Sequence, residues 1–123
     1  MKKIFTILFA LISFSCFAEN IKTDFTMKVF KQAQNEGKTV VVYSWNKFCT
    51  TCARQKPILK QAKKDFENVI FLNYEQTKNA DIAKYLDISY WSTIAVFKDN
   101  KELARGIGLI KKEKIYSLIQ KGT

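Results

Sequence analysis

Two cysteines three residues apart are the side chains of this sequence best suited to chemistry. Cys49 and Cys52 are separated by one helical turn, so a helix brings them to one face. An apolar run at residues 40–43 precedes them, and a helix-like segment follows as far as Phe66. The pair is therefore expected where a buried strand meets a helix N-terminus, and there the helix dipole favours the reactive thiolate. We interpret Cys49 as the exposed nucleophile and Cys52 as the resolving thiol, one turn deeper.

A structural disulfide is the alternative for the same pair. A disulfide stabilises chiefly by closing a loop, and this loop is among the shortest that a disulfide closes. The third cysteine, Cys16, lies in the predicted leader described below, so no other cysteine extends a disulfide framework. The cationic side chains of Lys47, Arg54 and Lys56 favour a thiolate nearby. Redox chemistry is therefore the favoured interpretation.

Residues 1–18 have the pattern of a cleaved secretory signal peptide. A basic start, an apolar run of eleven residues and small residues before a cut after Ala18 all fit that pattern. The run is too short to span a bilayer as a helix. A lipoprotein cut before Cys16 fits less well, because residues 13–15 match its usual lead-in poorly. We expect an exported, periplasmic protein in an oxidising compartment where a disulfide persists.

Residues 19–123 are expected to form one domain, since a chain of this length has room for one core and not for two. Cleavage lowers the formal charge from +10 to +8, because it removes Lys2 and Lys3. A basic excess can indicate nucleic-acid binding, but the predicted export and the lack of an aromatic-basic RNA-binding motif argue against it. We expect a solvated lysine-rich surface, with anionic lipid headgroups or an acidic partner as the alternative.

Helical and strand patterns alternate along this domain. Helices are predicted at residues 24–36, 49–66 and 111–120 and in a short segment after Asn79, and strands at residues 39–44, 69–74, 93–98 and 102–107. Asp24 is the expected N-cap of the first helix, Gly37 is its expected stop, and Pro57 is expected to kink the second helix. This order predicts an α/β fold, with a parallel sheet core between two helical layers and an antiparallel hairpin at one side.

Several further residues stand at the spacings of one known family. They are Trp45 and Phe48 before the first cysteine, Pro57 after the second, the segment 85–88, Thr93 and Gly108. With them the sequence resembles the thioredoxin family over residues 24–121, and among its members the exported thiol:disulfide interchange proteins. The resemblance implies a thioredoxin fold, with a central mixed sheet of four to five strands flanked by helices. It also implies a redox-active Cys49–Cys52 disulfide that works without a cofactor or a metal ion.

One departure from the family lies before the third predicted strand. Members of the family carry a cis-proline there that faces the cysteines, and this sequence has Ser92, preceded by Trp91. A cis bond before a residue other than proline costs about 3–4 kcal/mol. We therefore expect a trans Trp91–Ser92 peptide and a reshaped substrate groove. A hydroxyl facing the sulfurs would donate a hydrogen bond to a thiolate and favour the reduced pair, which is a hypothesis.

Two more departures concern the proton acceptor and the residues between the cysteines. The family's buried acid, six residues before the first cysteine, is replaced by Tyr43, whose ring we expect in the core. The chain has no His, so the resolving step would use water, a more distant acid such as Glu75, or no acceptor. Thr50 and Thr51 replace the family's Gly-Pro between the cysteines, and the sequence does not give the sign of their effect on the redox potential.

Three aromatic residues are candidates for an apolar recognition surface around the disulfide. They are Trp45, Phe48 and Trp91, of which the last two flank the predicted site, whereas a core position is an equal alternative for Trp45. With Ser92 and Thr93 they form the predicted substrate-binding and tuning set. An exposed apolar rim would suit a protein that docks extended polypeptide.

Three functions from different classes fit these observations. The leading hypothesis is a monomeric, exported thiol–disulfide oxidoreductase that acts on protein thiols and disulfides with a membrane or periplasmic electron-transfer partner, in a direction that the sequence does not set. A second is a non-catalytic adaptor of the same fold. A third is metal or Fe–S binding by the two cysteines in a dimer, because two thiols supply half of a tetrahedral site.

Overall fold

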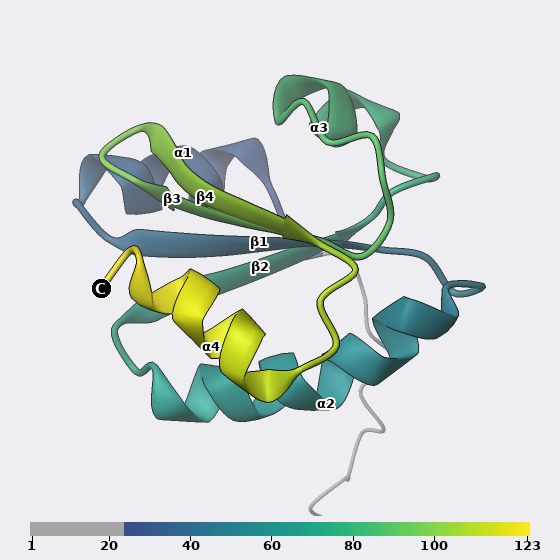
Figure 1. The fold of residues 1–123 in the computed structure, drawn as a ribbon. Helices are drawn as coiled ribbons and strands as arrows, with labels where there is room; N and C mark the ends of the chain where they lie inside the picture. Colours follow the sequence, from purple (N-terminus) through teal and green to yellow (C-terminus); the bar gives the residue numbers. More distant parts are fainter. Residues whose placement is uncertain (1–23) are drawn as a thin grey trace, which may run out of the picture.

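The computed structural model describes residues 24–123, and the predicted signal peptide lies outside them. The helices are α1 (Met27–Asn35), α2 (Thr50–Asp65), α3 (Ala80–Tyr85) and α4 (Lys112–Gln120), and the strands are β1 (Thr39–Trp45), β2 (Val69–Glu75), β3 (Thr93–Lys98) and β4 (Lys101–Ile107). This order confirms the predicted alternation of helices and strands (Figure 1). Within residues 24–123, no helix is long and apolar enough to cross a membrane.

The strands form one mixed sheet in the order β2-β1-β3-β4. The pair β1 and β2 is parallel, since α2 carries the chain back along the sheet between them, and β3 is antiparallel to both β1 and β4. This confirms the predicted α/β fold class, with a four-stranded mixed sheet flanked by helices. The parallel register places Trp45 beside Glu75 at the carboxyl ends of β1 and β2, and the cysteine pair follows that end of β1 directly.

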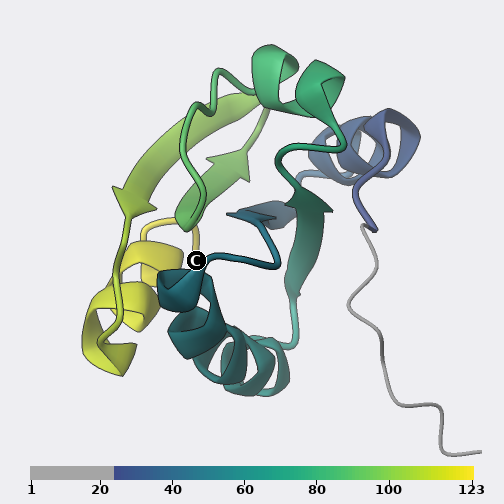
Figure 2. The same cartoon turned by 90° about the vertical axis from the view of Figure 1, so that its right-hand side faces the viewer.

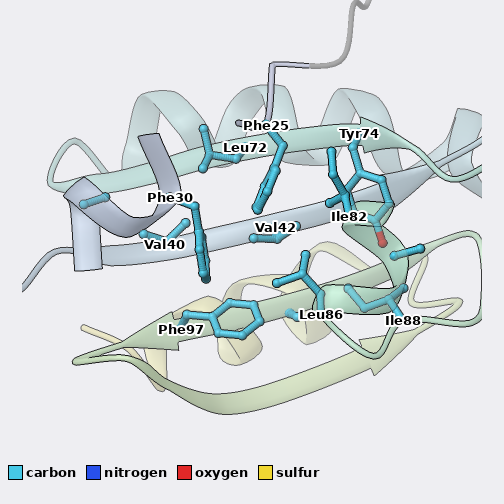
Figure 3. Packing of buried hydrophobic residues seen from close by; sticks show 13 residues of the cluster. Phe25, Phe30, Val40, Val42, Leu72, Tyr74, Ile82, Leu86, Ile88 and Phe97 are labelled. Carbon is cyan, nitrogen blue, oxygen red and sulfur yellow. The ribbon is translucent and has the colours of Figure 1, made fainter. Parts of the chain in front are cut away.

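Helices cover both faces of the sheet. Figures 1 and 2 show α1 and α3 on one face and α2 and α4 on the other. Side chains alternate along a strand, so Val40 and Val42 of β1 pack under α1 and α3 (Figure 3), whereas Val41, Tyr43 and Trp45 pack on the face of α2 and α4. This alternation explains why β1 is buried along its whole length, as its apolar sequence predicts, and it places Tyr43 and Trp45 in the same core layer as Cys52.

The start of the first helix differs from the prediction. The N-cap of α1 is Thr26, whose hydroxyl accepts a hydrogen bond from the backbone N–H of Val29 at 3.1 Å, and not Asp24. The Asp24 carboxylate instead accepts from the backbone N–H of Asn73 on β2 at 2.6 Å, and burial raises its pKa. The predicted cap was wrong because the Asp24 carboxylate is taken up by the tertiary contact with β2. Gly37 ends the turn with a φ of +72°, as predicted.

Candidate redox site

The site is centred on the disulfide between Cys49 and Cys52, whose Cα atoms are 5.2 Å apart. Cys49 is the N-cap of α2, and its Sγ accepts a hydrogen bond from the backbone N–H of Cys52 at 3.0 Å. Cys49 is half-buried, whereas Cys52 has no exposed surface. The pair therefore has the position inferred from the sequence, with Cys49 partly exposed and Cys52 in the core.

Tyr43 lies beneath the pair, where the family's buried acid would stand. Its ring is buried, as predicted, and its hydroxyl donates a hydrogen bond to the backbone carbonyl of Cys52 at 3.1 Å. Burial raises the pKa of this hydroxyl far above neutrality. Tyr43 therefore stays protonated and stabilises the first turn of α2; it does not act as a base.

One wall of the site is formed by residues 46–48 together with Glu75, and we name it the Asn46 wall. The buried Asn46 side chain accepts from the backbone N–H of Phe48 at 2.9 Å and donates to Glu75 Oε1 at 2.6 Å. The Glu75 carboxylate also accepts from Thr77 and from the backbone N–H of Lys78. This network fixes the loop that presents Phe48 and Cys49.

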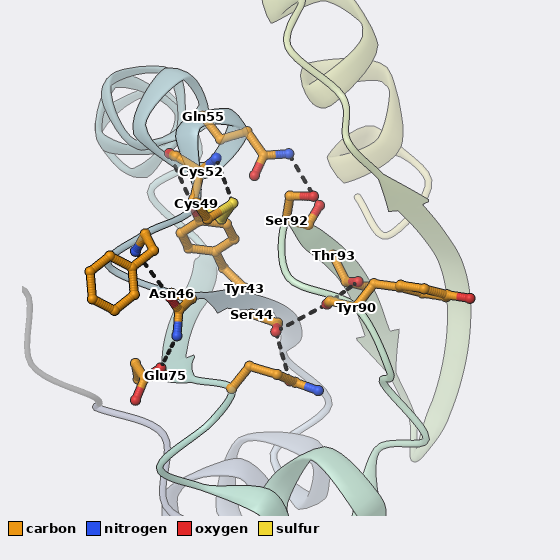
Figure 4. Close-up of a disulfide and its surroundings, with 12 residues drawn as sticks. Tyr43, Ser44, Asn46, Cys49, Cys52, Gln55, Glu75, Tyr90, Ser92 and Thr93 are labelled. Atoms are coloured by element: carbon orange, nitrogen blue, oxygen red, sulfur yellow. Dashed lines mark hydrogen bonds between the residues drawn. A yellow bond between two sulfur atoms is a disulfide. The ribbon is translucent and has the colours of Figure 1, made fainter.

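The same network decides what Glu75 can do. Burial raises the pKa of the Glu75 carboxyl, but hydrogen bonds from Thr77, Asn46 and Lys78 outweigh burial and hold it below its usual range. In Figure 4, Glu75 lies across Asn46 from the disulfide. Glu75 is therefore better suited to anchor the loop than to receive the Cys52 proton. Of the two proton acceptors named in the sequence analysis, this favours water.

The opposite wall is formed by residues 89–92 and Thr93, and we name it the Ser92 wall. The Trp91–Ser92 peptide is trans, as expected from the absent proline, and Ser92 has a φ of +59°. The Ser92 carbonyl accepts from Gln55 Nε2 at 3.2 Å and from the backbone N–H of Gly108 at 3.1 Å. The Thr93 hydroxyl donates to the Tyr90 carbonyl at 2.7 Å, which closes the turn (Figure 4).

A groove of about 490 Å³ runs between α2 and the Ser92 wall and reaches Cys49. Its lining residues are Phe48, Cys49, Thr50, Thr51, Ser89, Tyr90, Trp91, Ser92 and Ile107. The side chains of Phe48, Tyr90 and Trp91 are 75%, 64% and 39% exposed. Exposed aromatic side chains beside a reachable sulfur form a surface that can hold an apolar part of a substrate.

The structure separates the predicted substrate-binding and tuning set into two groups. Phe48, Trp91 and Ser92 line the groove. Trp45 takes the core alternative: it is buried, and its indole N–H donates to the Asn73 side chain at 2.9 Å. Thr93 is also buried, and its hydroxyl shapes the turn through its bond to the Tyr90 carbonyl. Its part in substrate binding or tuning stays a prediction. Burial in both cases follows from their places in β1 and β3, the two central strands.

Two of the cationic side chains that we expected near the pair lie against aromatic residues that precede it in the sequence. Lys47 Nζ is 5.0 Å from the centre of the Phe48 ring, and Lys56 Nζ is 4.7 Å from the centre of the Trp45 ring. Both ammonium groups therefore stay close to aromatic side chains that flank the cysteines.

Two buried polar residues of the site were not found in the sequence. Asn46 gave no pattern of its own, since its amide nitrogen donates to Glu75 on β2 and to Thr77 in the loop that follows. Gln55 did leave a signal, because it lies at helical spacing with the buried Cys52, Leu59 and Ala62. A polar residue on that face has to find hydrogen-bond partners inside the protein.

A metal site built from this chain alone has no further support. Among residues 24–123, no group of three or more His, Cys, Asp or Glu side chains is placed to hold a metal ion. The two thiols therefore remain half of a tetrahedral ligand set, and the metal alternative still requires a second chain or an outside ligand.

Comparison with known proteins gives the same assignment as the fold and the site. The Thioredoxin family model matches residues 19–121. The chain is 29% identical to the thioredoxin of Mycoplasma genitalium over 93 residues, which is 76% of this chain and 91% of that protein. It is 30% identical to the thioredoxin of Chlamydia pneumoniae over 82 residues, 67% of this chain and 80% of that one. The chain belongs to the thioredoxin family.

Solved structures agree on the fold. The crystal structure of Trxlp from Edwardsiella tarda superposes with a TM-score of 0.74 at 20% identity, covering 77% of this chain and 94% of that one. Fasciola hepatica thioredoxin gives a TM-score of 0.69 at 23% identity, covering 76% of this chain and 91% of that one. At these identities the likeness shows the fold, and the redox assignment rests on the family and on the cysteine pair. Thioredoxins are thiol–disulfide oxidoreductases, and this chain is a redox protein of that family.

Proposed function

We propose that this protein is an exported thiol–disulfide oxidoreductase that reduces or exchanges the disulfides of other proteins. The observation that carries the proposal is the Cys49–Cys52 pair, with Cys49 half-buried at the N-terminus of α2 and Cys52 fully buried one turn deeper. Thiol–disulfide exchange requires a reachable attacking thiolate and a second thiol behind it.

The reaction begins on the reduced pair. The Cys49 thiolate attacks one sulfur of a substrate disulfide, a mixed disulfide forms, and the other substrate sulfur leaves as a thiolate. Cys52 then attacks Cys49 Sγ, releases the second substrate thiol and closes the Cys49–Cys52 disulfide. The Cys52 proton passes to water or to a released thiolate, because Tyr43 and Glu75 are both engaged elsewhere. The reverse sequence of steps oxidises substrate thiols.

The attacking thiolate is stabilised by its place at the start of α2. In the disulfide, the Cys52 N–H already donates to Cys49 Sγ at 3.0 Å. The same N–H can donate to a thiolate, and a hydrogen bond to a charged acceptor is stronger than one to a neutral acceptor. The positive end of the helix dipole adds to this stabilisation.

We propose extended polypeptide as the substrate. The groove beside Cys49 is open along one side of α2, and exposed aromatic residues flank it. An extended chain can place a cystine sulfur at Cys49 while its apolar neighbours contact Phe48 and Trp91. The lack of a proline at Ser92 leaves that wall with a backbone different from the family pattern, so substrate preference is expected to differ.

Export and regeneration are further parts of the proposal. The leader pattern of residues 1–18 supports export, and a membrane or periplasmic dithiol partner would return two electrons to the pair after each turnover. We propose a monomer, because one chain carries both cysteines and the groove. N-terminal sequencing of the protein from a periplasmic fraction tests export, with Glu19 as the expected first residue.

A redox titration in dithiothreitol and glutathione buffers, read by thiol alkylation, tests the central proposal. A reversible midpoint between about −270 and −120 mV is expected, the range of known dithiol catalysts. Cys49→Ser should lower dithiothreitol-driven reduction of insulin by about a thousandfold or more, and Cys52→Ser should accumulate the mixed disulfide. A disulfide that resists reduction below about −300 mV would mark a structural bond and favour the adaptor. Stoichiometric metal in a reduced dimer would favour the metal-binding alternative.

A further inference from the structure

Gln55 is a buried polar residue that the thiol–disulfide reaction described above does not use. It lies on α2 three residues after Cys52, and neither residue has exposed surface. Residues three apart on a helix are neighbours on one face, so the Gln55 side chain leaves the helix beside the resolving cysteine. Figure 4 shows it extending past the disulfide toward Ser92.

The two partners of Gln55 fix the orientation of its amide. Nε2 donates to the Ser92 carbonyl at 3.2 Å and to the Leu109 carbonyl at 2.9 Å. Both partners are carbonyl oxygens, which only accept, so the NH₂ end of the amide must face them and the oxygen must point away. Through this amide, α2 holds both the Ser92 wall and the segment that follows β4.

The oxygen of the same amide has no donor. Within the described residues 24–123, Gln55 Oε1 is buried and makes no hydrogen bond, although an amide oxygen can accept two. A buried acceptor without a partner is costly and calls for an explanation in a native fold. The disulfide form of the pair cannot supply a donor, because neither sulfur carries a proton.

Reduction creates a donor one helical turn away, at Cys52 on the same face of α2. Dithiothreitol transfers two electrons and two protons to the pair and itself closes to its cyclic disulfide. One proton is held at Cys52 Sγ, inside the protein, and the other stays on Cys49 or is released to solvent when Cys49 becomes a thiolate. The new Cys52 S–H is buried and needs an acceptor of its own.

We propose that Gln55 is a positioning residue of the redox pair: Nε2 ties the Ser92 wall to α2, and Oε1 accepts a hydrogen bond from the Cys52 thiol once the disulfide is reduced. This inference rests on the proposed thiol–disulfide exchange at the same pair. The bond exists only in the reduced form, so it favours that form and makes the pair more oxidising than it would be without Gln55. It also stabilises the protonated Cys52 thiol, so Cys52 stays neutral until the mixed disulfide has formed.

A redox titration of the full chain and of Gln55→Met tests the proposal. Methionine has a similar length and neither a donor nor an oxygen. We expect the ratio of reduced to oxidised protein in a fixed dithiothreitol buffer to fall about tenfold, a midpoint about 30 mV more negative. The matched control is Gln61→Met on the exposed side of the same helix, which should leave the midpoint unchanged.

The outcomes separate this proposal from the function on which it rests. A role limited to tying the loops would lower the stability of both redox forms alike and leave the midpoint in place, and that result would overturn the proposal. A pair that is not reversibly reducible in the wild-type protein would instead overturn the proposed function. A reversible wild-type pair with equal midpoints in Gln55→Met and Gln61→Met would overturn only the role of Gln55.

A second measurement does not depend on the folding of Gln55→Met. In protein with ¹³C-labelled glutamine side chains, the Gln55 carbonyl resonance should move downfield on reduction, whereas that of Gln61 should not. Cys52→Ser keeps a donor at the position of the thiol and should show the reduced position of the resonance. Cys52→Ala has no donor and should show the oxidised position. A Gln55 resonance that is the same in these two variants would exclude the hydrogen bond.

Discussion

The two walls of the redox site are held in different ways. On the Asn46 wall, the buried Glu75 carboxylate and the buried Asn46 amide are hydrogen-bonded to each other and to the surrounding backbone. The bond between the two side chains is 2.6 Å long. On the Ser92 wall, the backbone has a positive φ at a residue with a side chain, and one amide from α2 holds its carbonyl. That amide has a free oxygen within the described part of the chain.

The difference indicates which side of the site can respond to the redox state. The Asn46 wall is joined by a charged network whose bonds do not involve the sulfurs, so reduction leaves them intact. The Ser92 wall is joined to α2 by Gln55, next to the sulfur that gains a proton. The loop that presents Cys49 is therefore fixed, and the wall on the opposite side of the groove is coupled to the redox state of the pair.

Ser92→Pro is expected to have the largest effect on stability of the variants that compare the two walls. Proline holds φ near −65°, whereas Ser92 has a φ of +59°, so the Ser92 wall must rebuild. We expect a loss of about 3 kcal/mol in the free energy of unfolding of the oxidised protein, measured in urea. Unchanged stability would show that this wall tolerates a proline backbone and is not held as described.

Ser92→Gly is the matched control for that variant. Glycine adopts a positive φ without strain, so stability should rise by up to about 1 kcal/mol. The same variant removes the hydroxyl that we expected to face the sulfurs. If that hydroxyl donates to the Cys49 thiolate, the pKa of the Cys49 thiol rises in Ser92→Gly, and an unchanged pKa would remove the hydroxyl from the mechanism.

Asn46→Ala tests the opposite wall. It removes the bonds to Phe48 and Glu75 and leaves part of a buried carboxylate without its amide donor. The expected loss is about 2 kcal/mol in the free energy of unfolding, similar in the oxidised and reduced proteins. A loss confined to one redox form would contradict the view that this wall is independent of the pair.

Removal of the exposed aromatic side chains compares the two walls as substrate-binding surfaces. Phe48→Ala and Trp91→Ala each remove an exposed aromatic side chain, one from each wall. We expect each to lower kcat/KM for an unfolded protein disulfide about fivefold, mainly through KM. Reduction of a small aliphatic disulfide serves as the control and should change little, and an equal loss for both substrates would speak against a docking role.

Glu75→Gln gives the smallest expected effect and depends on pH. The pKa of the folded Glu75 carboxyl lies below its usual range, so its ionised form adds stability above a pH of about 4.3, and this contribution is lost as the pH falls through the folded pKa. Wild type should therefore be more stable than Glu75→Gln at pH 7, and the difference should shrink in acid. A stability difference that grows in acid would contradict a lowered pKa for the Glu75 carboxyl.

The sequence alone determined the parts of this protein that depend on local pattern. The alternation of strands and helices, the cysteine pair at the start of α2, the burial of Tyr43 and the turn at Gly37 followed from periodicity and residue type over a few neighbouring positions. The trans Trp91–Ser92 peptide followed from the cost of a cis bond without proline.

Only the tertiary structure decided which distant groups meet. Thr26 replaced Asp24 as the helix cap because Asp24 reaches β2, and Trp45 became a core residue because β1 is a central strand. Gln55 is joined to Ser92 and Leu109 across 37 and 54 residues of sequence. A hydrogen bond depends on distance and direction between two groups, and local periodicity describes only the burial of each group by itself.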